Sequence, residues 1–389
     1  MKRWVLGTVA LMFVTSFLIC QGAAAKETVT LGFIGPFTGG SAFEGVGARN
    51  CFELALKKAN ASGKYKYEYK AIFLDDESQP ATGVSAALKL TSDPKVIAAA
   101  GHWNSSVAMA TTKIFHQFKM ALSIWCCGLE GITLQGFPEI TRVGPTSYIE
   151  NVWLGDFLVG KMKYKRWSII NDPTDYGIQN RDNWIEATKK NGGQILSQDT
   201  IPVGTQDFRP ILTKIKELNP DGVYAGNTVT EAGLIKLQMS KMGINTVYGG
   251  TGGLYIDKFH ELAPWPTSEG SFAASGGTSP EKLPWWPEFK KEYDADYKDP
   301  IGWYQLVAYD NATVLMTAIE KVGPDREKVV SEIRKTSFDG LSGKVAFDKN
   351  GQNVFSTVTI CTAQDGKWVV WEDSLYAKGS RKLPPPKSK

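Results

Sequence analysis

The segment with the clearest potential for chemistry is the polar trio Asn104, Ser105 and Ser106, which follows an apolar run and a glycine. The run, residues 96–100, is typical of a short buried strand that turns at Gly101. Asn and Ser often begin helices because their side chains accept hydrogen bonds from free backbone N–H groups. A helix start also carries unpaired donors and partial positive charge, which suit a carboxylate or a phosphate. The segment therefore predicts a site for a ligand carboxylate, with an ordinary capped helix as the alternative.

Ligands of open α/β sheets bind beyond the carboxyl ends of strands, so the surrounding chain must supply such a sheet. Strands are expected at 29–34, 67–74, 96–100 and 121–125, and helices at 48–59, 81–90 and 106–118. After residues 144–147 the alternation restarts, with helices at 149–162, 177–190, 208–216 and 231–242 and strands at 167–171, 194–200, 222–225 and 246–249. This order implies an α/β protein with two Rossmann-like lobes, each a parallel-type sheet flanked by helices.

The last third of the chain is less regular. A strand is expected at 271–275, helices at 285–297, 304–322 and 324–336, and a hairpin from 355–361 and 367–371. The hairpin turns at Asp365-Gly366, a favoured turn pair. The pattern does not show which lobe each of these pieces joins.

Enzyme chemistry has no support in the sequence. A Gly-x-Gly-x-x-Gly dinucleotide motif, a P-loop Gly-Lys-Ser/Thr and a Gly-x-Ser-x-Gly elbow are all missing. The histidines His102, His116 and His260 lack the spacing of metal ligands. We therefore expect no catalytic residues, no metal and no cofactor. His102 adjoins the proposed site, where it has either a ligand contact or a structural role.

The N-terminus has the pattern of an export signal. Lys2 and Arg3 precede an apolar stretch at 4–19, and Ala23-Ala24-Ala25 supplies the small residues of a cleavage site. We predict cleavage after about Ala25 and a periplasmic protein. Lipid attachment at Cys20 is the alternative, although Ile19 is larger than the small residue usual before a lipidated cysteine. No later segment is long and apolar enough to span a bilayer.

The composition is that of an ordinary globular protein, with 42% hydrophobic and 22% charged residues among 389. The net charge of +4, two units of which come from the signal, is too small and dispersed for nucleic-acid binding. The C-terminal segment 378–389 is basic and proline-rich, which predicts a disordered tail. Four cysteines follow the signal, and the adjacent pair Cys126-Cys127 predicts either free thiols or a strained vicinal disulfide.

Several short motifs occur in the order found in one known family. The chain resembles the periplasmic solute-binding proteins of the Leu/Ile/Val-binding type, the receptors of ABC importers. The motifs are Leu31-Gly-Phe-Ile-Gly-Pro-Phe-Thr-Gly39, Gly47-Ala-Arg-Asn-Cys-Phe-Glu-Leu-Ala55, Asp75-Asp-Glu-Ser-Gln-Pro80, Gly101-His-Trp-Asn-Ser-Ser106, Asp172-Pro-Thr-Asp-Tyr-Gly177, Asp207-Phe208, Pro220-Asp-Gly-Val-Tyr224 and Asp299-Pro300 before Tyr304.

The resemblance implies a type I periplasmic binding protein whose lobes are joined by three crossover strands, near Thr146, Ser275 and Gly351. Lobe 1 would comprise 26–146 and 276–351, and lobe 2 would comprise 147–275 and 352–377. A small ligand would bind in the cleft, and hinge bending would close the lobes over it. The implied partners are the small-molecule ligand and the membrane permease of an ABC importer, with the receptor a monomer.

The resemblance also implies positions for ligand contacts. Ser105 aligns with the serine whose hydroxyl and N–H hold the ligand carboxylate, with Asn104 beside it. Trp103 falls at an apolar contact, and Tyr176 and Tyr304 match aromatic residues that face the cleft. The other expected positions are Phe43, Cys126, Cys127, Gly128, Thr228 and Thr251.

One departure from the family bears on the ligand. The amino-acid binders place a carboxylate for the ligand ammonium in a glycine-rich loop of lobe 2, where this chain has Thr251. A desolvated ammonium without a charged partner costs several kcal/mol. Glu44, Asp75 or Glu231 would have to supply the charge, or the ligand is not an α-amino acid. Aromatic residues suit an apolar ligand or a cation, although any of them can be core: Phe43, Trp103, Trp125, Tyr176 and Tyr304.

The expected function is capture of a small carboxylate-bearing solute, a branched-chain or other apolar amino acid or a related compound, for an ABC importer. Two alternatives remain. The ligand is an aromatic or other carboxylate that is not an amino acid, or the same fold serves a ligand sensor that reports to a different membrane protein.

Overall fold

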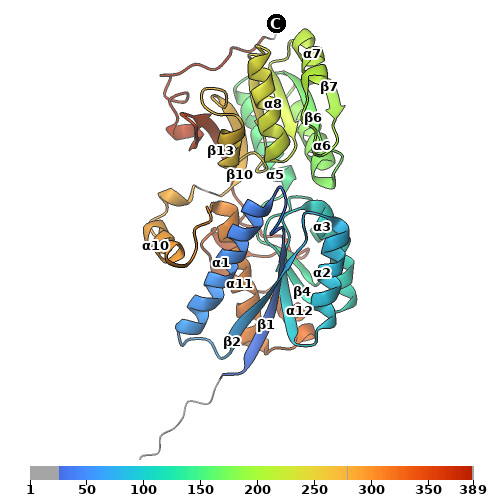
Figure 1. Ribbon diagram of the computed structural model, residues 1–389, viewed down its shortest axis with the longest axis vertical. Coiled ribbons are helices and arrows are strands. Elements are labelled where there is room, and N and C mark those ends of the chain that lie inside the picture. The colour runs from blue at the N-terminus through green and yellow to red at the C-terminus, as the bar shows by residue number, and fades with distance from the viewer. Residues whose placement is uncertain (1–25, 278, 388–389) are drawn as a thin grey trace, which may run out of the picture.

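The computed structural model describes residues 26–277 and 279–387, which form two lobes stacked along the long axis of the molecule (Figure 1). Residues 1–25 lie outside the described residues, so cleavage after Ala25 and lipid attachment at Cys20 stay predictions. Within the two described ranges, no helix has the length and apolar character needed to cross a membrane.

Lobe 1 is built around a parallel sheet of five strands in the order β2-β1-β3-β4-β5. The strands are β1 (Thr28–Gly35), β2 (Glu68–Asp75), β3 (Val96–Gly101), β4 (Ala121–Ile124) and β5 (Ile140–Arg142). The helices of this lobe are α1 (Ala42–Ala61), α2 (Pro80–Ser92), α3 (Ser105–Gln117), α4 (Gly131–Leu134), α10 (Trp286–Asp296), α11 (Trp303–Val322) and α12 (Arg326–Ile333). The last three, which the pattern alone did not assign to a lobe, therefore pack on lobe 1.

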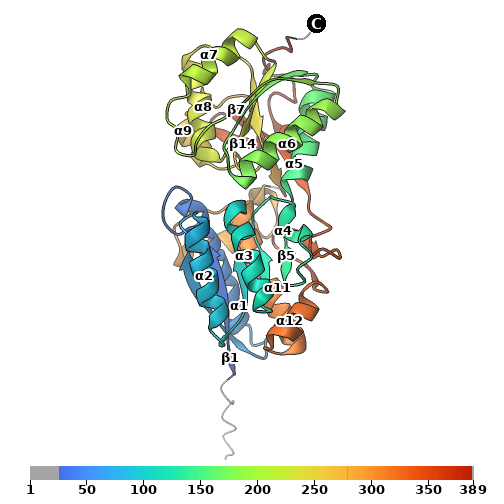
Figure 2. The same ribbon diagram turned by 90° about the vertical axis from the view of Figure 1, so that its right-hand side faces the viewer.

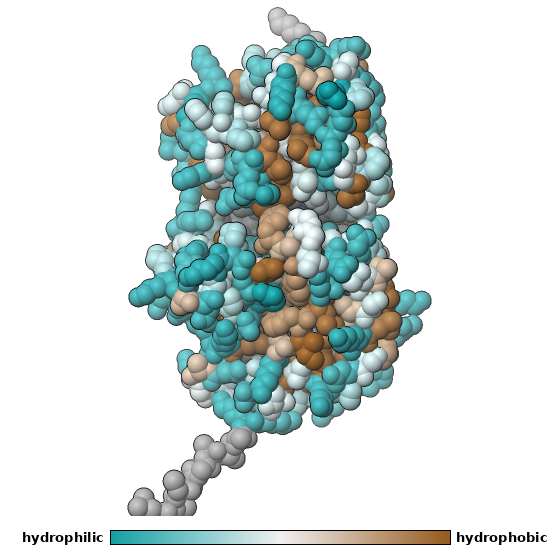
Figure 3. Space-filling model, viewed as in Figure 1, coloured by the Kyte–Doolittle hydropathy of each residue, from teal (hydrophilic) through white to brown (hydrophobic). Residues whose placement is uncertain are grey.

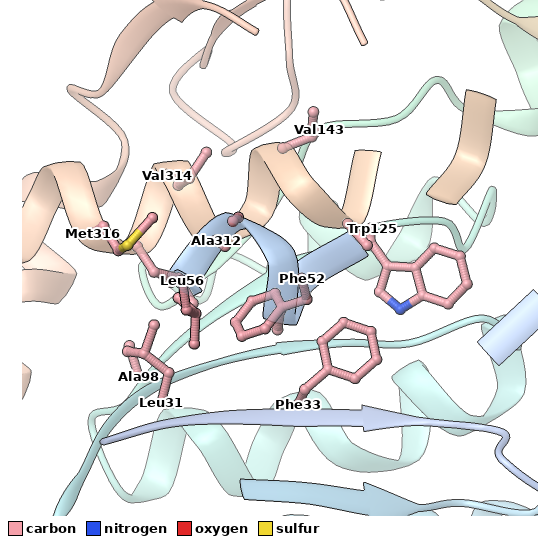
Figure 4. Packing of buried hydrophobic residues seen from close by; sticks show 14 of the residues in the cluster. Leu31, Phe33, Phe52, Leu56, Ala98, Trp125, Val143, Ala312, Val314 and Met316 are labelled. Carbon is pink, nitrogen blue, oxygen red and sulfur yellow. The ribbon is translucent and has the colours of Figure 1, made fainter. Parts of the chain in front are cut away.

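The alternation of side chains along β1 builds a core on each face of this sheet. Leu31 and Phe33 belong to the core under α1 and α11, whereas Ile34 belongs to the core under α2 and α3. Figure 4 shows Phe33 between Phe52 and Trp125, with ring centroids 5.1 and 6.2 Å away. Trp125 has no exposed surface, so it is a core residue, one of the two alternatives that its sequence position left open.

Lobe 2 contains a sheet of seven strands in the order β14-β13-β10-β9-β8-β6-β7. Its strands are β6 (Arg166–Asn171), β7 (Gln194–Thr200), β8 (Gly222–Gly226), β9 (Val247–Gly250), β10 (Ser271–Gly276), β13 (Val358–Gln364) and β14 (Lys367–Val370). Strands β6 to β10 are parallel, and the hairpin β13-β14 adds an antiparallel edge. The covering helices are α5 (Ser147–Gly155), α6 (Asp175–Lys190), α7 (Arg209–Leu218), α8 (Val229–Lys241) and α9 (Lys258–Leu262).

The predicted α/β architecture is confirmed, with two lobes that the chain connects after β5, after β10 and before β13. Figure 2 shows these connections bunched on one side of the waist between the lobes. The hairpin turn also follows its sequence, because Asp365 and Gly366 both take the positive φ of a tight two-residue turn (53° and 74°). The remaining elements are short: η1 (Asp156–Lys161), η2 (Pro280–Lys282), η3 (Trp371–Asp373), β11 (Ser337–Asp339) and β12 (Lys344–Ala346).

The C-terminal segment corrects the expectation of a disordered tail. Up to residue 387 it lies on lobe 2, where Tyr164 Oη donates a 2.8 Å hydrogen bond to the carbonyl of Pro384. Arg381 forms ion pairs with Glu269 and Asp365, and Leu383 packs against the apolar core of lobe 2. Arg381 of this basic segment thus has acidic partners on the lobe surface, which composition alone does not show.

Candidate ligand-binding cleft

A cavity of about 630 Å³ lies between the two lobes and is lined by the loops that follow the strands of both sheets. Such a volume is within the range of small-molecule sites. Figure 3 shows the outer surface mostly hydrophilic, with hydrophobic residues gathered along the middle of this face. The lining includes Glu77, Trp103, Asn104, Ser105, Cys126, Gly128, Ser147, Glu150, Asp172, Tyr176, Thr228, Glu231, Gly252 and Tyr304.

The start of α3 presents unpaired polar atoms to this cavity. Asn104 is the N-cap residue, but its side chain makes no hydrogen bond to the helix, which corrects the expected side-chain cap. Its Oδ1 atom and the Oγ atom of Ser105 are both buried and have no partner within the described chain. By contrast, α5 and α6 are capped by the side chains of Thr146 and Thr174. The first turn of α3 is therefore open to an anionic group.

Buried polar contacts hold this helix start in place. Nε2 of His102 lies 2.9 Å from Oγ1 of Thr111, and Nδ1 lies 3.3 Å from Oδ2 of Asp76. The thiol of Cys127 donates a 3.0 Å hydrogen bond to the carbonyl of His102. His102 and Cys127 are buried and do not line the cavity, so the structure gives His102 a supporting role. No disulfide joins the cysteines of the described ranges, and Cys126 and Cys127 are free thiols.

Aromatic rings form one wall of the cavity. Trp103 meets the ring of Tyr304 edge-on, with centroids 6.0 Å apart, and lies 5.4 Å from the core residue Trp125. Tyr176 faces the cavity from lobe 2, and its hydroxyl lies 2.9 Å from Oγ1 of Thr251. Because Trp125 backs Trp103, the wall is anchored in the core of lobe 1 and offers a firm apolar surface to a ligand.

The charged residues of the cavity are all acidic: Glu77, Glu150, Asp172 and Glu231. Among the described residues that line it there is no Lys, Arg or His. Glu77 is exposed, and oxygens of Asp172 and Glu231 accept hydrogen bonds from neighbouring loop residues. Asp172, Glu231 and Glu150 are all buried, and Glu150 differs because its hydrogen-bond donors come from both lobes. The cavity therefore combines an anion-binding helix start with excess negative charge elsewhere.

Two donors approach the carboxylate of Glu150. Tyr304 Oη donates to Oε1 over 2.8 Å, and the N–H of Gly252 donates to Oε2 over 3.4 Å. Burial raises the pKa of Glu150 from its ordinary 4.5 to about 7, although both hydrogen bonds act to lower it. A Cβ atom on Gly252 would lie 1.7 Å from Tyr304 Oη and 2.9 Å from Oε1. Residue 252 therefore has to be glycine for these three groups to meet.

The structure brings eight of the eleven expected positions to the cavity wall: Trp103, Asn104, Ser105, Cys126, Gly128, Tyr176, Thr228 and Tyr304. The other three lie outside the lining. Phe43 packs against the apolar core of lobe 2, Cys127 is buried beneath α3, and Thr251 donates a 2.9 Å hydrogen bond to Asn180.

Sequence reasoning missed two cavity residues on α5, Ser147 and Glu150. The hydroxyl of Ser147 is buried, unpartnered within the described chain, and lies at the cavity. The sequence feature that could have pointed to this helix is Glu150, the one acidic residue in the otherwise uncharged stretch 147–155. Of the alternatives for a cation partner, Glu231 reaches the cavity, whereas Glu44 and Asp75 do not line it.

The lobes also touch at the rim of the cavity. The N–H of Glu130 in lobe 1 donates a 3.1 Å hydrogen bond to Gln179 on α6, whose side-chain amide donates back to the Glu130 carboxylate. Nearby, the N–H of Asp175 donates to Ser106 Oγ over 3.2 Å. No cluster of three potential metal ligands occurs in the part of the chain that the structure describes.

Known proteins that are similar to this chain include solute receptors, which fits a two-lobed structure with a cavity between the lobes. The sequence profile described as "Periplasmic binding protein" matches residues 28–367. The chain belongs to this family of periplasmic binding proteins. The family consists of solute receptors rather than enzymes, and the predicted resemblance to Leu/Ile/Val-binding proteins is confirmed.

Individual relatives are distant but cover most of the chain. The leucine-, isoleucine-, valine-, threonine- and alanine-binding protein of Pseudomonas aeruginosa is 26% identical, over 84% of this chain and 87% of that protein. A leucine-binding protein from Thermotoga maritima is 25% identical and superposes with a TM-score of 0.81, over 88% of this chain and 97% of the other. A solute-binding protein from R. palustris in complex with benzoate, 21% identical, shares the fold with a TM-score of 0.79 over 88% and 95%.

Proposed function

We propose that this periplasmic binding protein is the substrate receptor of an ABC importer and captures a small carboxylate-bearing solute between its lobes. The solute class is a branched-chain or other apolar amino acid, or a related compound. The observation that carries the proposal is the start of α3, where the Ser105 hydroxyl, a hydrogen-bond donor, is buried at the cavity without a partner within the described chain. A ligand carboxylate would accept hydrogen bonds there and benefit from the helix dipole.

The rest of the cavity suits an apolar body attached to that carboxylate. The rings of Trp103, Tyr176 and Tyr304 cover the ligand position from both lobes. Closure of the lobes would exclude water and strengthen the few polar contacts to the ligand. The amino-acid specificities of the Pseudomonas aeruginosa and Thermotoga maritima proteins support the same class.

A second candidate ligand is an aromatic carboxylate without an amino group. The aromatic wall favours it, and the R. palustris relative in complex with benzoate shows that such a ligand fits this fold. Both candidates use the same carboxylate site at α3 and differ in the group at the other end of the cavity.

The proposal includes the place of action and the partner. The protein would be exported, with its leader removed after about Ala25, and would act as a monomer that delivers its ligand to a membrane permease. Gene neighbours that encode a permease and an ATPase would support transport, whereas a neighbouring histidine kinase would support the alternative of a ligand sensor.

The direct test is native mass spectrometry of freshly purified protein, followed by calorimetry with the compound that co-purifies. We expect a bound mass that matches an amino acid or a related carboxylate. The proposal fails if no carboxylate in a broad metabolite panel raises the melting temperature or changes the small-angle scattering profile.

A further inference from the structure

We infer that Glu150 recognises a positively charged nitrogen of the ligand, so that the cavity selects zwitterions over simple carboxylates. This inference rests on the proposed function and names the ligand class more narrowly. It assigns the cation site to α5, whereas the amino-acid binders of the family place their carboxylate in the glycine-rich loop after β9, where this chain has Thr251.

The first support is the position of Glu150. It lines the cavity, its side chain is 4% exposed, and no Lys, Arg or His of the described lining neutralises it. A buried carboxylate without a cation is costly, and the hydrogen bonds from Tyr304 and Gly252 compensate only in part. A ligand cation would supply the missing charge and strengthen binding accordingly.

The second support is the arrangement around Gly252. The glycine-rich loop carries no acid, and the side chain of Thr251 points to Asn180 instead of the cavity. The missing Cβ of Gly252 leaves room for Tyr304 and Glu150 to meet. The loop thus makes space for a carboxylate from α5.

The third support is that the cavity has one site that favours an anion and a second site that favours a cation. The start of α3 at Ser105 favours an anion, and the carboxylate of Glu150 favours a cation. The edge-on pair of Trp103 and Tyr304 links the two, because Trp103 precedes the α3 start and Tyr304 bonds to Glu150. Aromatic faces beside a carboxylate also suit an ammonium group through cation–π attraction.

Ligand binding should then be linked to release of a proton. With a pKa of about 7, Glu150 is partly protonated at neutral pH in the ligand-free protein. An incoming cation favours the ionised form, so affinity should rise with pH up to and slightly beyond 7. The titratable groups around Glu150 on the neighbouring elements are Cys126 (after β4), Tyr176 (α6), Tyr224 (β8) and Tyr304 (α11), and Glu44 (α1) lies on the same side as Cys126.

None of these neighbours adds a positive charge. Burial raises the pKa of Glu44 to about 8, so it is mostly neutral at pH 7, and burial raises the pKa values of Cys126 and the three tyrosines above their ordinary range. Because Glu44 does not line the cavity, Glu150 is the carboxyl group of this cluster that a ligand cation would ionise near neutral pH.

The test uses calorimetry with two matched pairs of probes, leucine with 4-methylpentanoate and phenylalanine with 3-phenylpropanoate. Within whichever pair the wild type binds, we expect it to prefer the amino acid to the matched carboxylate. Glu150→Gln should lower the affinity for that amino acid by about 30-fold or more. The affinity for the matched carboxylate should change by less than about threefold, since the α3 site is untouched. Glu217→Gln, an exposed charge change on α7, is the control.

A second measurement uses the wild-type protein and needs no variant. Calorimetry at pH 7 in buffers of different ionisation enthalpy should show proton release on amino-acid binding and none on binding of the matched carboxylate. Unchanged amino-acid affinity in Glu150→Gln, or a wild type that binds the matched carboxylate equally well, overturns the role of Glu150 but leaves the proposed function standing.

The reverse pattern separates the two proposals. If the wild type binds only cationic probes without a carboxylate, such as choline, and Glu150→Gln abolishes this binding, the cation site stands and the carboxylate receptor fails. If none of the probes binds to the wild type, both fail.

Discussion

Tyr304 on lobe 1 donates a 2.8 Å hydrogen bond to the carboxylate of Glu150 on lobe 2. This contact crosses the ligand cavity, so the ligand-recognising acid of one lobe is oriented by the aromatic wall of the other. The N–H of Gly252 approaches the second carboxylate oxygen. The Glu150 carboxylate therefore links ligand recognition to the relative position of the two lobes.

We expect Tyr304→Phe to weaken binding of a zwitterionic ligand by about threefold to tenfold at pH 7. The Tyr304 hydroxyl lowers the pKa of Glu150, so its removal leaves more of the carboxyl protonated and moves the rise in affinity to higher pH. Calorimetry between pH 6 and 9 measures both effects. Tyr148→Phe, at an exposed position on α5, is the control, and an unshifted pH profile in Tyr304→Phe would contradict the coupling.

Ser105→Ala should weaken binding of any carboxylate ligand by about tenfold and leave the melting temperature nearly unchanged. The reason is that Ser105 Oγ has no partner within the described chain, so its loss breaks no hydrogen bond of the fold. Ser85→Ala removes an exposed serine of α2 and serves as the control. Wild-type affinity in Ser105→Ala would rule out the carboxylate site at α3.

Gly252→Ala should reduce ligand affinity by more than about tenfold with a smaller effect on stability. The new methyl group would lie 1.7 Å from Tyr304 Oη, and the ring cannot move freely because Trp103 and Trp303 pack against it. Tyr304 would have to leave Glu150, or the loop would have to shift. Gly131→Ala is the matched control, since the nearest atom to its Cβ lies 3.9 Å away. Equal affinity of both variants would show that the Tyr304–Glu150 contact is dispensable.

Most of the fold could be predicted because its signals are local. The strand at 194–200 has its expected limits, and the Asp365-Gly366 turn has its expected conformation, since each depends on a few adjacent residues. The three-residue strand β5 and the five-residue helix α9 were missed because they are too short to show a periodic pattern. Packing of the C-terminal segment on lobe 2 depends on partners far away in sequence, such as Glu269, and was also missed.

The site was predictable on lobe 1 and less so on lobe 2. Ser105 could be found because a strand, a turn and a polar helix start are contiguous. Glu150 could not, because its importance comes from Tyr304 and Gly252, which are 154 and 102 residues away in sequence. Phe43 shows the converse: the motif places it near the cleft, but the closeness of the lobes lets it pack on lobe 2 instead.

The ligand-free stability of Glu150→Gln should exceed that of the wild type at pH 8. The folded-state pKa of Glu150 is about 7 and its ordinary value is 4.5, so the folded protein binds more protons than the unfolded chain between these values. Stability from this group is therefore full below pH 4.5 and is lost as pH rises through 7. Glutamine has no charge to desolvate, and the gain at pH 8 is on the order of 2–3 kcal/mol. Chemical denaturation at pH 4.5 and pH 8 measures it. Equal stability of both proteins at pH 8 would mean that Glu150 is well solvated or already paired. A ligand cation would then not be needed to compensate its charge.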